Sequence, residues 1–191
     1  NEITGKSICI ATGGRPRNID GIPSSSGLWF YKDALQVDKI PKRLLVVGSG
    51  AIGVEFASFF AQMGSDVSLL ESQPTILPNE DLDISNFVEK QFLNRGIKIY
   101  KNHSLLSLKE RGKLFEAELE SVDKKLALSF DKAILAIGIV GNIESLNLEG
   151  LDIKFSNGGI VVDEYCKTNV NNIYAIGDVA SPPWLAHKAS H

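Results

Sequence analysis

A glycine pattern, Gly48-x-Gly50-x-x-Gly53, constrains the fold more than any other feature of the sequence, because it separates two segments of different periodicity. The preceding segment, Leu44–Val47, is a continuous apolar run, as is typical of a strand buried on both faces of a parallel sheet. The following segment, Ala51–Met63, repeats its apolar residues with the period of a helix. A glycine-rich turn between such a strand and such a helix predicts a dinucleotide-binding βαβ unit.

Each glycine of this pattern has its own physical role. Gly48 permits the tight turn, Gly50 lets a pyrophosphate approach the backbone, and Gly53 lets the helix pack closely on the strand. The N-terminus of the helix adds partial positive charge beside the phosphates. We therefore expect the segment Gly48–Glu55 to bind a dinucleotide.

An acidic residue strengthens this interpretation. Glu71 ends the next apolar strand, Val67–Leu70, and lies 71 − 53 = 18 residues after the third glycine. An acid at that point accepts hydrogen bonds from the adenosine ribose of NAD and repels the 2′-phosphate of NADP. The adjacent Ser72 and Gln73 supply no arginine for a 2′-phosphate. The pattern favours NAD, although a solvated carboxylate at a strand end is the alternative.

The rest of the chain predicts an α/β fold. Asp81–Arg95 has the pattern of an amphipathic helix with four residues facing inward: Ile84, Phe87, Val88 and Phe92. Alternating apolar residues from 105 to 130 predict a small antiparallel meander. One helical turn is expected around Asp33–Val37. Short apolar runs predict further strands at residues 7–11, 97–100, 133–137, 159–163 and 173–176. The prediction is a Rossmann-like domain of three layers with a parallel sheet.

Composition excludes several other classes of protein. An apolar share of 43% and a charged share of 23% are ordinary for a soluble globular protein. Lys and Arg total 20 against 23 Asp and Glu, so we expect no nucleic-acid partner. No apolar run approaches the roughly 18 residues of a membrane span, and the first residues do not resemble a secretion signal. Cys9 and Cys166 are too far apart for a C-x-x-C motif, and we predict no metal site.

Two acidic residues have alternative interpretations. Glu55 lies in the first turns of the predicted helix, where it could complement the helix dipole or face the nicotinamide end of the cofactor. Asp178 follows an apolar strand and Gly177, where it could bind ribityl or ribose hydroxyls or cap a helix. The histidines have no nearby ligand partners in sequence, so no metal or general-base role is assigned to them.

Four glycine-marked segments occur in an order that resembles the pyridine nucleotide-disulfide oxidoreductases. They are Ile8–Gly13, the glycine pattern with Glu71, Ile134–Gly138 and Thr168–Asp178. Trp184–Ala189 and Gly48–Glu55 resemble the members that oxidise dihydrolipoamide more than they resemble glutathione or mercuric reductases. The resemblance covers essentially the whole chain.

The resemblance implies two cofactors, FAD and NAD, and assigns residues to each. The residues implied for FAD are Thr12, Gly13, Gly14, Asp178, and the backbone of Trp184, Leu185, Ala186 and His187 beside the flavin ring. Those implied for NAD are Gly48, Ser49, Gly50, Ala51, Ile52, Gly53, Val54, Glu55, Glu71, Leu105 on the adenine side, and the backbone of Gly138. No catalytic residue is assigned within this chain.

The chain departs from the family pattern in one motif. Members often have Gly-Arg-x-Pro after the strand that ends at Gly138, whereas this chain has Ile139-Val140-Gly141. An arginine that could offer a cationic contact is therefore missing from that motif.

The resemblance also implies that the chain is an internal fragment. It would comprise the end of a flavin domain (1–37), an NAD-binding domain (38–156) and the return of the flavin domain (157–191). The redox cysteine pair would lie upstream and the His-Glu acid/base pair downstream, so the chain is expected to bind NAD without turnover.

For the parent protein, the resemblance implies a homodimer that oxidises dihydrolipoamide on 2-oxoacid dehydrogenase complexes and contributes to cell redox homeostasis. The expected compartment is a bacterial cytoplasm or, alternatively, a mitochondrial matrix. Another disulfide or flavin reductase is the nearest alternative, and a non-catalytic NAD-binding module is a more distant one.

Overall fold

The computed structural model describes residues 3–22, 27–122 and 124–190. They form two compact units. One is built from the middle of the chain, Pro16–Gly138, and the other combines the residues up to Arg15 with those from Ile139 onward. The chain thus leaves the second unit, forms the first and returns.

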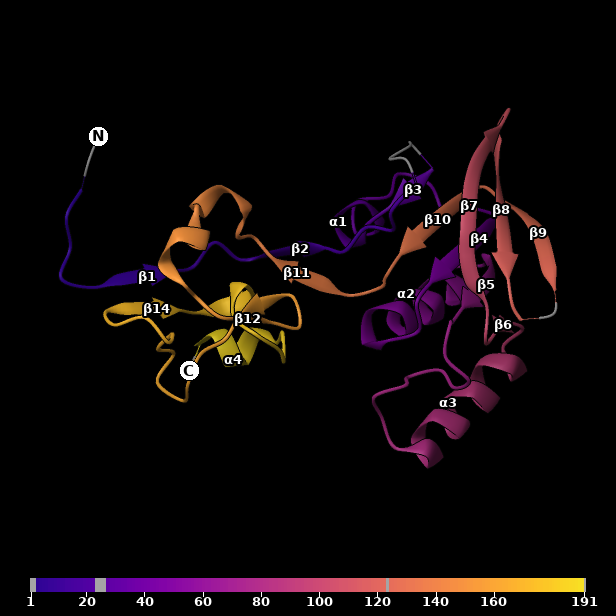
Figure 1. Cartoon of the computed structure of the whole chain (residues 1–191). Coiled ribbons are helices and arrows are strands. Elements are labelled where there is room, and N and C mark those ends of the chain that lie inside the picture. Colours follow the sequence, from indigo (N-terminus) through magenta and orange to yellow (C-terminus); the bar gives the residue numbers. More distant parts are fainter. Residues whose placement is uncertain (1–2, 23–26, 123, 191) are drawn as a thin grey trace. The chain divides into compact units, whose positions relative to one another are not determined.

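The centre of the first unit is a parallel sheet of five strands, as the sequence predicts (Figure 1). Every neighbouring pair in it is parallel. The strand order is β3 (Leu28–Trp29), β10 (Lys132–Leu135), β4 (Arg43–Val47), β5 (Asp66–Leu70) and β6 (Lys98–Tyr100). The predicted strands at 44–47, 67–70 and 97–100 are therefore confirmed.

Helices cover one face of this sheet. They are α1 (Tyr31–Ala34), α2 (Ala51–Gln62) and α3 (Leu82–Asn94). Phe60 of α2 and Phe92 of α3 pack against Leu44 and Val46 of the sheet in one buried cluster. The single turn α1 overlaps the turn expected around Asp33–Val37 but begins two residues earlier.

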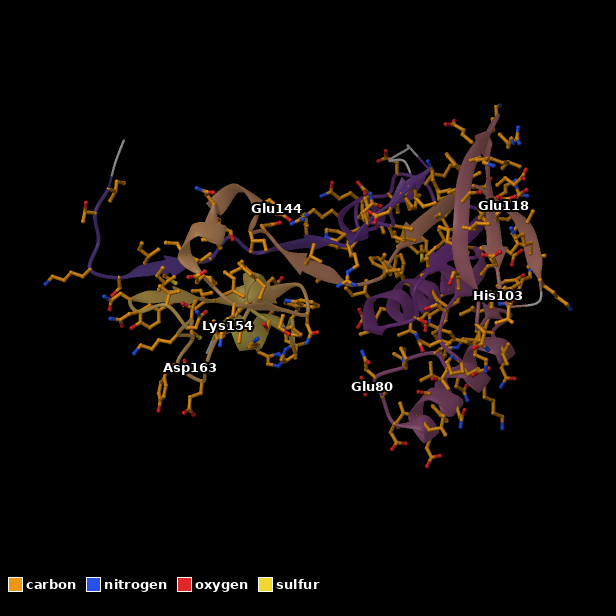
Figure 2. All side chains as sticks on the ribbon, viewed as in Figure 1. Glu80, His103, Glu118, Glu144, Lys154 and Asp163 are labelled. Carbon is orange, nitrogen blue, oxygen red and sulfur yellow. The ribbon has the colours of Figure 1, made fainter. Side chains whose placement is uncertain are left out.

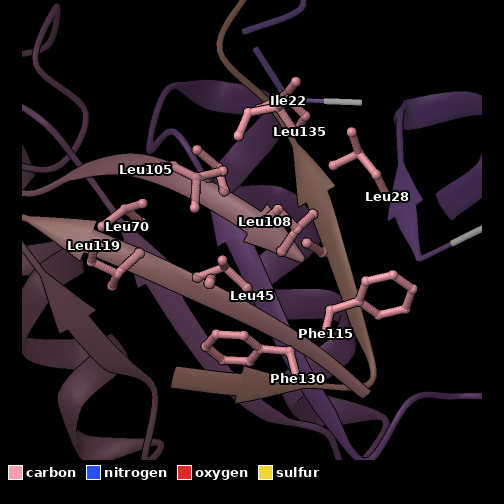
Figure 3. Close-up of a cluster of buried hydrophobic side chains, with 13 residues drawn as sticks. Ile22, Leu28, Leu45, Leu70, Leu105, Leu108, Phe115, Leu119, Phe130 and Leu135 are labelled. Carbon is pink, nitrogen blue, oxygen red and sulfur yellow. The ribbon is translucent and has the colours of Figure 1, made fainter. Parts of the chain in front are cut away.

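An antiparallel meander covers the opposite face. It consists of β7 (Ser104–Arg111), β8 (Leu114–Glu120) and β9 (Lys125–Phe130), paired in that order. Alternate residues of β8, namely Phe115, Ala117 and Leu119, point into a second buried cluster with Leu45 of the sheet (Figure 3). Period-2 alternation therefore predicted the strands and their buried face correctly.

The prediction for the inward face of α3 was half wrong. Phe92 is buried and Val88 partly so, but Ile84 and Phe87 are 53% and 62% exposed. The helix instead turns small, buried Ser85 toward the neighbouring loop, where its Oγ donates to the carbonyl of Leu77 at 3.2 Å. Residues 85, 88 and 92 share a face at helical spacing, which rotates Ile84 and Phe87 toward solvent.

Among the residues that the structure describes, the second unit contains three two-stranded sheets. Parallel β1 (Ile8–Ile10) and β14 (Ile173–Ala175) form the first, and antiparallel β12 (Phe155–Ser156) and β13 (Gly159–Ile160) form the second. The third pairs β11 (Ile139–Gly141) with β2 (Gly14–Pro16), at whose last residue the chain enters the first unit. The short helices are η1 (Glu144–Leu146), η2 (Leu148–Leu151), η3 (Gly177–Val179) and α4 (Ala186–Ser190).

The strand predicted at residues 7–11 is present as β1 and is only partly buried. Ile10 is buried among Ile160, Ile173 and Ala175, but Ile8 is 56% exposed and Cys9 is exposed. Ile8 and Ile10 point to the same face of the strand, so the buried cluster covers only the C-terminal end of that face.

The two units differ in extent from the domains expected from the sequence, 1–37, 38–156 and 157–191. Compactness alone does not test functional domain boundaries, so those remain predictions. Within the described ranges, no helix combines the length and the apolar character needed to cross a membrane.

Phe60 and its neighbour Phe59 provide a test of the helical layer. Phe60 is fully buried, whereas Phe59 is 49% exposed. Phe60→Ala should lower the free energy of unfolding by about 3–5 kcal/mol, because it leaves a cavity between α2 and the sheet. Phe59→Ala should cost about 1 kcal/mol or less. Urea unfolding followed by circular dichroism measures both, and equal costs would contradict this packing.

Candidate functional site

The parallel sheet brings three predicted segments to one edge. Gly48 follows β4, Glu71 follows β5, and Gly138 follows shortly after β10. The three strand ends are aligned, since the Gly48 N–H donates to the carbonyl of Leu70 at 2.8 Å and the Ala136 N–H to that of Val47 at 2.8 Å. Ligands of open α/β sheets bind at this carboxyl edge.

The geometry of the three glycines agrees with the roles predicted for them. Gly48 has a φ of +96°, in the left-handed region. A Cβ on Gly53 would lie 1.9 Å from the carbonyl oxygen of Gly48, so the helix can approach the strand only without one. A Cβ on Gly50 would meet no atom within 4 Å. The backbone at Gly50, which is the N-cap of α2, is therefore open to a ligand.

The Glu71 carboxylate is buried beneath this turn and is only 6% exposed. Its Oε2 accepts hydrogen bonds from the backbone N–H of Ser49 at 3.0 Å and from the Ser49 hydroxyl at 2.6 Å. Its Oε1 accepts from the backbone N–H of Gln73 at 2.8 Å and from the Ser72 hydroxyl at 3.2 Å. The interpretation of Glu71 as a solvated strand-end carboxylate is therefore wrong.

The loop after Glu71 supports the glycine turn from the other side. The N–H of Leu77 donates to the carbonyl of Ser49 at 2.9 Å. Leu77 has a φ of +48°, a strained conformation for a leucine, and Ser85 of α3 binds its carbonyl. Both polar ends of the Ser49 backbone are thus held by neighbouring segments.

The remaining residues predicted for this edge are placed as follows. Glu55 lies on the exposed surface of α2, so its two interpretations stay open. The side chain of Leu105 is buried in the core under the meander, which leaves its backbone for any ligand contact. His103 precedes it, and its N–H donates to the carbonyl of Glu71 at 3.0 Å.

In the second unit the predicted residues of the first and last segments meet. The Thr12 hydroxyl donates to the carbonyl of Asn142 at 2.6 Å, and the Asn142 side-chain amide donates to the carbonyl of Thr12 at 2.9 Å. Gly13 has a φ of +71°. A Cβ on Gly14 would lie 3.1 Å from the Cβ of Asp178, so these two residues are in close contact.

An arginine also lies in this region, although the expected motif lacks one. Arg15 Nη1 donates to the carbonyl of Gly141 at 3.1 Å and to Oδ1 of Asn142 at 3.2 Å. The same guanidinium pairs with both carboxylate oxygens of Glu144, which is labelled in Figure 2. The hydrogen bond from Arg15 lowers the pKa of the Glu144 carboxyl below its ordinary value of 4.5.

The final predicted segment lies in the same unit. Trp184 is partly buried, and its Nε1–H donates to the carbonyl of Ala180 at 3.0 Å. Leu185, Ala186 and His187 are exposed. The part of the chain that the structure describes holds no group of three or more His, Cys, Asp or Glu side chains suited to a metal ion.

Sequence reasoning missed several of these interactions. Ser49 was named only for its place in the motif, and its bond to Glu71 depends on the pairing of β4 with β5. The Arg15–Glu144 pair joins residues 129 positions apart, and no local pattern signals it. For the contact between Ser49 and Glu71, the only signal in the sequence was the spacing between the glycines and Glu71.

Comparison with known proteins gives a consistent result. The sequence pattern of the family described as pyridine nucleotide-disulphide oxidoreductase matches residues 1–191. Curated relatives include two proteins named dihydrolipoyl dehydrogenase. One, from Rhizobium etli, is 48% identical over 190 residues, which are 98% of this chain and 40% of the relative. The other, from Zymomonas mobilis, is 47% identical over 97% of this chain and 40% of its own length.

Solved structures show the same fold. LpdA from Mycobacterium tuberculosis superposes with a TM-score of 0.85 and 30% identity, over 96% of this chain and 40% of that one. The HOCl-induced flavoprotein disulfide reductase RclA from Escherichia coli gives a TM-score of 0.83 at 30% identity, over 98% of this chain and 43% of its own. The chain thus spans about two fifths of the length of these relatives.

Alanine substitutions distinguish the glycine that packs against the strand, Gly53, from the glycine that leaves its backbone open to a ligand, Gly50. Gly53→Ala should lower the free energy of unfolding by about 2 kcal/mol or more, because its Cβ would collide with a backbone oxygen. Gly50→Ala should change it by less than about 1 kcal/mol, since that Cβ meets open space. Chemical unfolding of both variants checks this, and a large cost for Gly50→Ala would show that its surroundings are filled.

The Arg15–Glu144 pair predicts a pH dependence. Because folding lowers the pKa of Glu144, the pair stabilises the folded chain above pH 4.5 and loses that contribution as the pH falls through the folded-state pKa. Glu144→Gln should therefore lower the thermal midpoint slightly, by about one or two degrees, at pH 7, and this deficit should shrink as the pH is lowered below 4.5. Exposed Glu164→Gln is the control, and a deficit that keeps the same size as the pH falls below 4.5 would refute the assignment.

Proposed function

Because the chain belongs to the pyridine nucleotide-disulphide oxidoreductase family, we propose that it is the nucleotide-binding core of a dihydrolipoyl dehydrogenase. Membership of the family implies FAD and NAD as cofactors. When bound, these two groups supply the redox chemistry of such an enzyme. The residues of this chain hold and orient them.

The observation that carries the proposal is the pairing of an open glycine backbone with a buried acid at one sheet edge. The pyrophosphate of NAD would lie against Gly50 and the first N–H groups of α2, where no side chain obstructs it. The adenosine ribose would lie above Glu71, whose carboxylate is held in place beneath the turn. A 2′-phosphate would meet the same negative charge, which supports NAD rather than NADP.

The second unit supports an assignment to FAD. Thr12, Gly13, Gly14 and Asp178 come from opposite ends of the chain and lie together in this unit. Glycine at 13 leaves the backbone accessible, glycine at 14 permits the close approach to Asp178, and Asp178 offers a carboxylate for hydroxyl groups. We assign Trp184–His187 to the flavin ring, where backbone N–H groups would stabilise negative charge.

The activity of the whole protein is part of the proposal. We propose that the parent enzyme oxidises dihydrolipoamide carried by 2-oxoacid dehydrogenase complexes, and that it acts as a homodimer in the cytoplasm of a bacterium. The names of the curated relatives support this activity. A second candidate is a flavoprotein disulfide reductase with another electron acceptor, which the similarity to RclA favours.

Calorimetric titration of the chain with NADH tests the nucleotide site. Wild type should bind NADH more tightly than NADPH. Gly50→Val should weaken NADH binding at least about tenfold, because its side chain would occupy the space assigned to the pyrophosphate. Glu80→Gln, an exposed change in the neighbouring loop (Figure 2), should leave binding unchanged. A folded wild-type chain that binds neither nucleotide would overturn the proposed NAD site.

A further inference from the structure

The two oxygens of the Glu71 carboxylate have different surroundings. Both donors to Oε2 belong to Ser49, and both donors to Oε1 belong to the following segment, Ser72 and Gln73. A carboxylate accepts about four hydrogen bonds, so all of its acceptor positions are occupied. A ribose hydroxyl can therefore donate to Glu71 only by replacing one of these four donors.

Three of the four donors cannot easily be replaced. The N–H groups of Ser49 and Gln73 belong to the backbone. The Ser49 side chain is fully buried, and its hydroxyl forms the shortest of the four bonds at 2.6 Å. If it gave up Glu71, that hydroxyl would be left inside the protein without water, which is energetically costly.

The fourth donor is different. Ser72 is exposed, and its hydroxyl forms the longest of the four bonds at 3.2 Å. On leaving Glu71 it can turn to solvent and keep a hydrogen bond to water. The acceptor position on Oε1 used by Ser72 is therefore the one most easily vacated.

We propose that Ser49 is a positioning residue that fixes the Glu71 carboxylate with Oε1 available to the adenosine ribose, and that the Ser72 hydroxyl yields its place to a ribose hydroxyl. This inference rests on the proposed NAD site and adds the residues that determine how Glu71 meets the ribose hydroxyls. Ser49 acts through Glu71, whereas Ser72 competes with the nucleotide. Removing the Ser49 hydroxyl should therefore weaken NADH binding, whereas removing the Ser72 hydroxyl should not.

The test compares Ser49→Ala with Ser72→Ala, each titrated with NADH and with an NADH analogue lacking both hydroxyls of the adenosine ribose. Ser49→Ala should weaken NADH binding about tenfold, which is typical for loss of a hydrogen bond to a charged group. It should leave the affinity for the analogue within about twofold, because the analogue does not use Glu71. Ser72→Ala should keep NADH binding unchanged or tighten it by up to about threefold.

The outcomes separate the possible roles. If Ser49→Ala weakens both ligands by the same factor, Ser49 only supports the glycine turn and the proposal fails. It also fails if Ser49→Ala has no effect, or if Ser72→Ala weakens NADH as much as Ser49→Ala does. A wild-type chain that binds neither ligand overturns the NAD site itself, whereas wild-type binding with an indifferent Ser49 overturns this inference alone.

Discussion

The contact between Ser49 and Glu71 is the interaction on which the candidate site depends. It joins the turn after β4 to the end of β5, and it fixes a buried carboxylate directly beneath an open stretch of backbone. It can form because β4 and β5 are paired in register, with Val47 opposite Leu70. Packing of both faces of the sheet, by helices on one side and the meander on the other, maintains that register. The alignment of β4 with β5 therefore determines the geometry of the site.

Glycine gives this edge its shape. Gly53 allows α2 to approach the backbone of Gly48, and that approach directs the N-terminus of the helix at the same space that Gly50 leaves open. Partial positive charge from the helix and negative charge from Glu71 then lie on either side of the backbone that Gly50 leaves open. Such an arrangement suits a ligand with a pyrophosphate at one point and a sugar diol at the next. A second unit with its own glycine backbone and acid, Gly13 and Asp178, suits a second nucleotide-like cofactor.

Local sequence pattern predicted most of the elements that form the site. The glycine spacing, the apolar run before it and the acid 18 residues later all depend on residues close in sequence, and they gave β4, α2, β5 and the position of Glu71. Alternation gave β8 and its buried face. The helix α3 was predicted correctly, but half of its predicted inward face was wrong, because tertiary contacts at Ser85 decide which of several apolar residues face the sheet. It could not anticipate Arg15 with Glu144 or Thr12 with Asn142, since those pairs form only after the chain has returned to the second unit.

Amide chemical shifts during a titration with NAD test the central claim most directly. In a ¹⁵N-labelled chain, the signals of Gly50, Ala51 and Ile52 at the start of α2 and of Gln73 beside Glu71 should shift together and saturate with one affinity. The signals of exposed Glu164 and of Gly112 in the meander turn should remain in place. Saturable shifts at some other part of the chain, with those of Gly50–Ile52 and Gln73 unchanged, would contradict the assignment of this sheet edge as the nucleotide site.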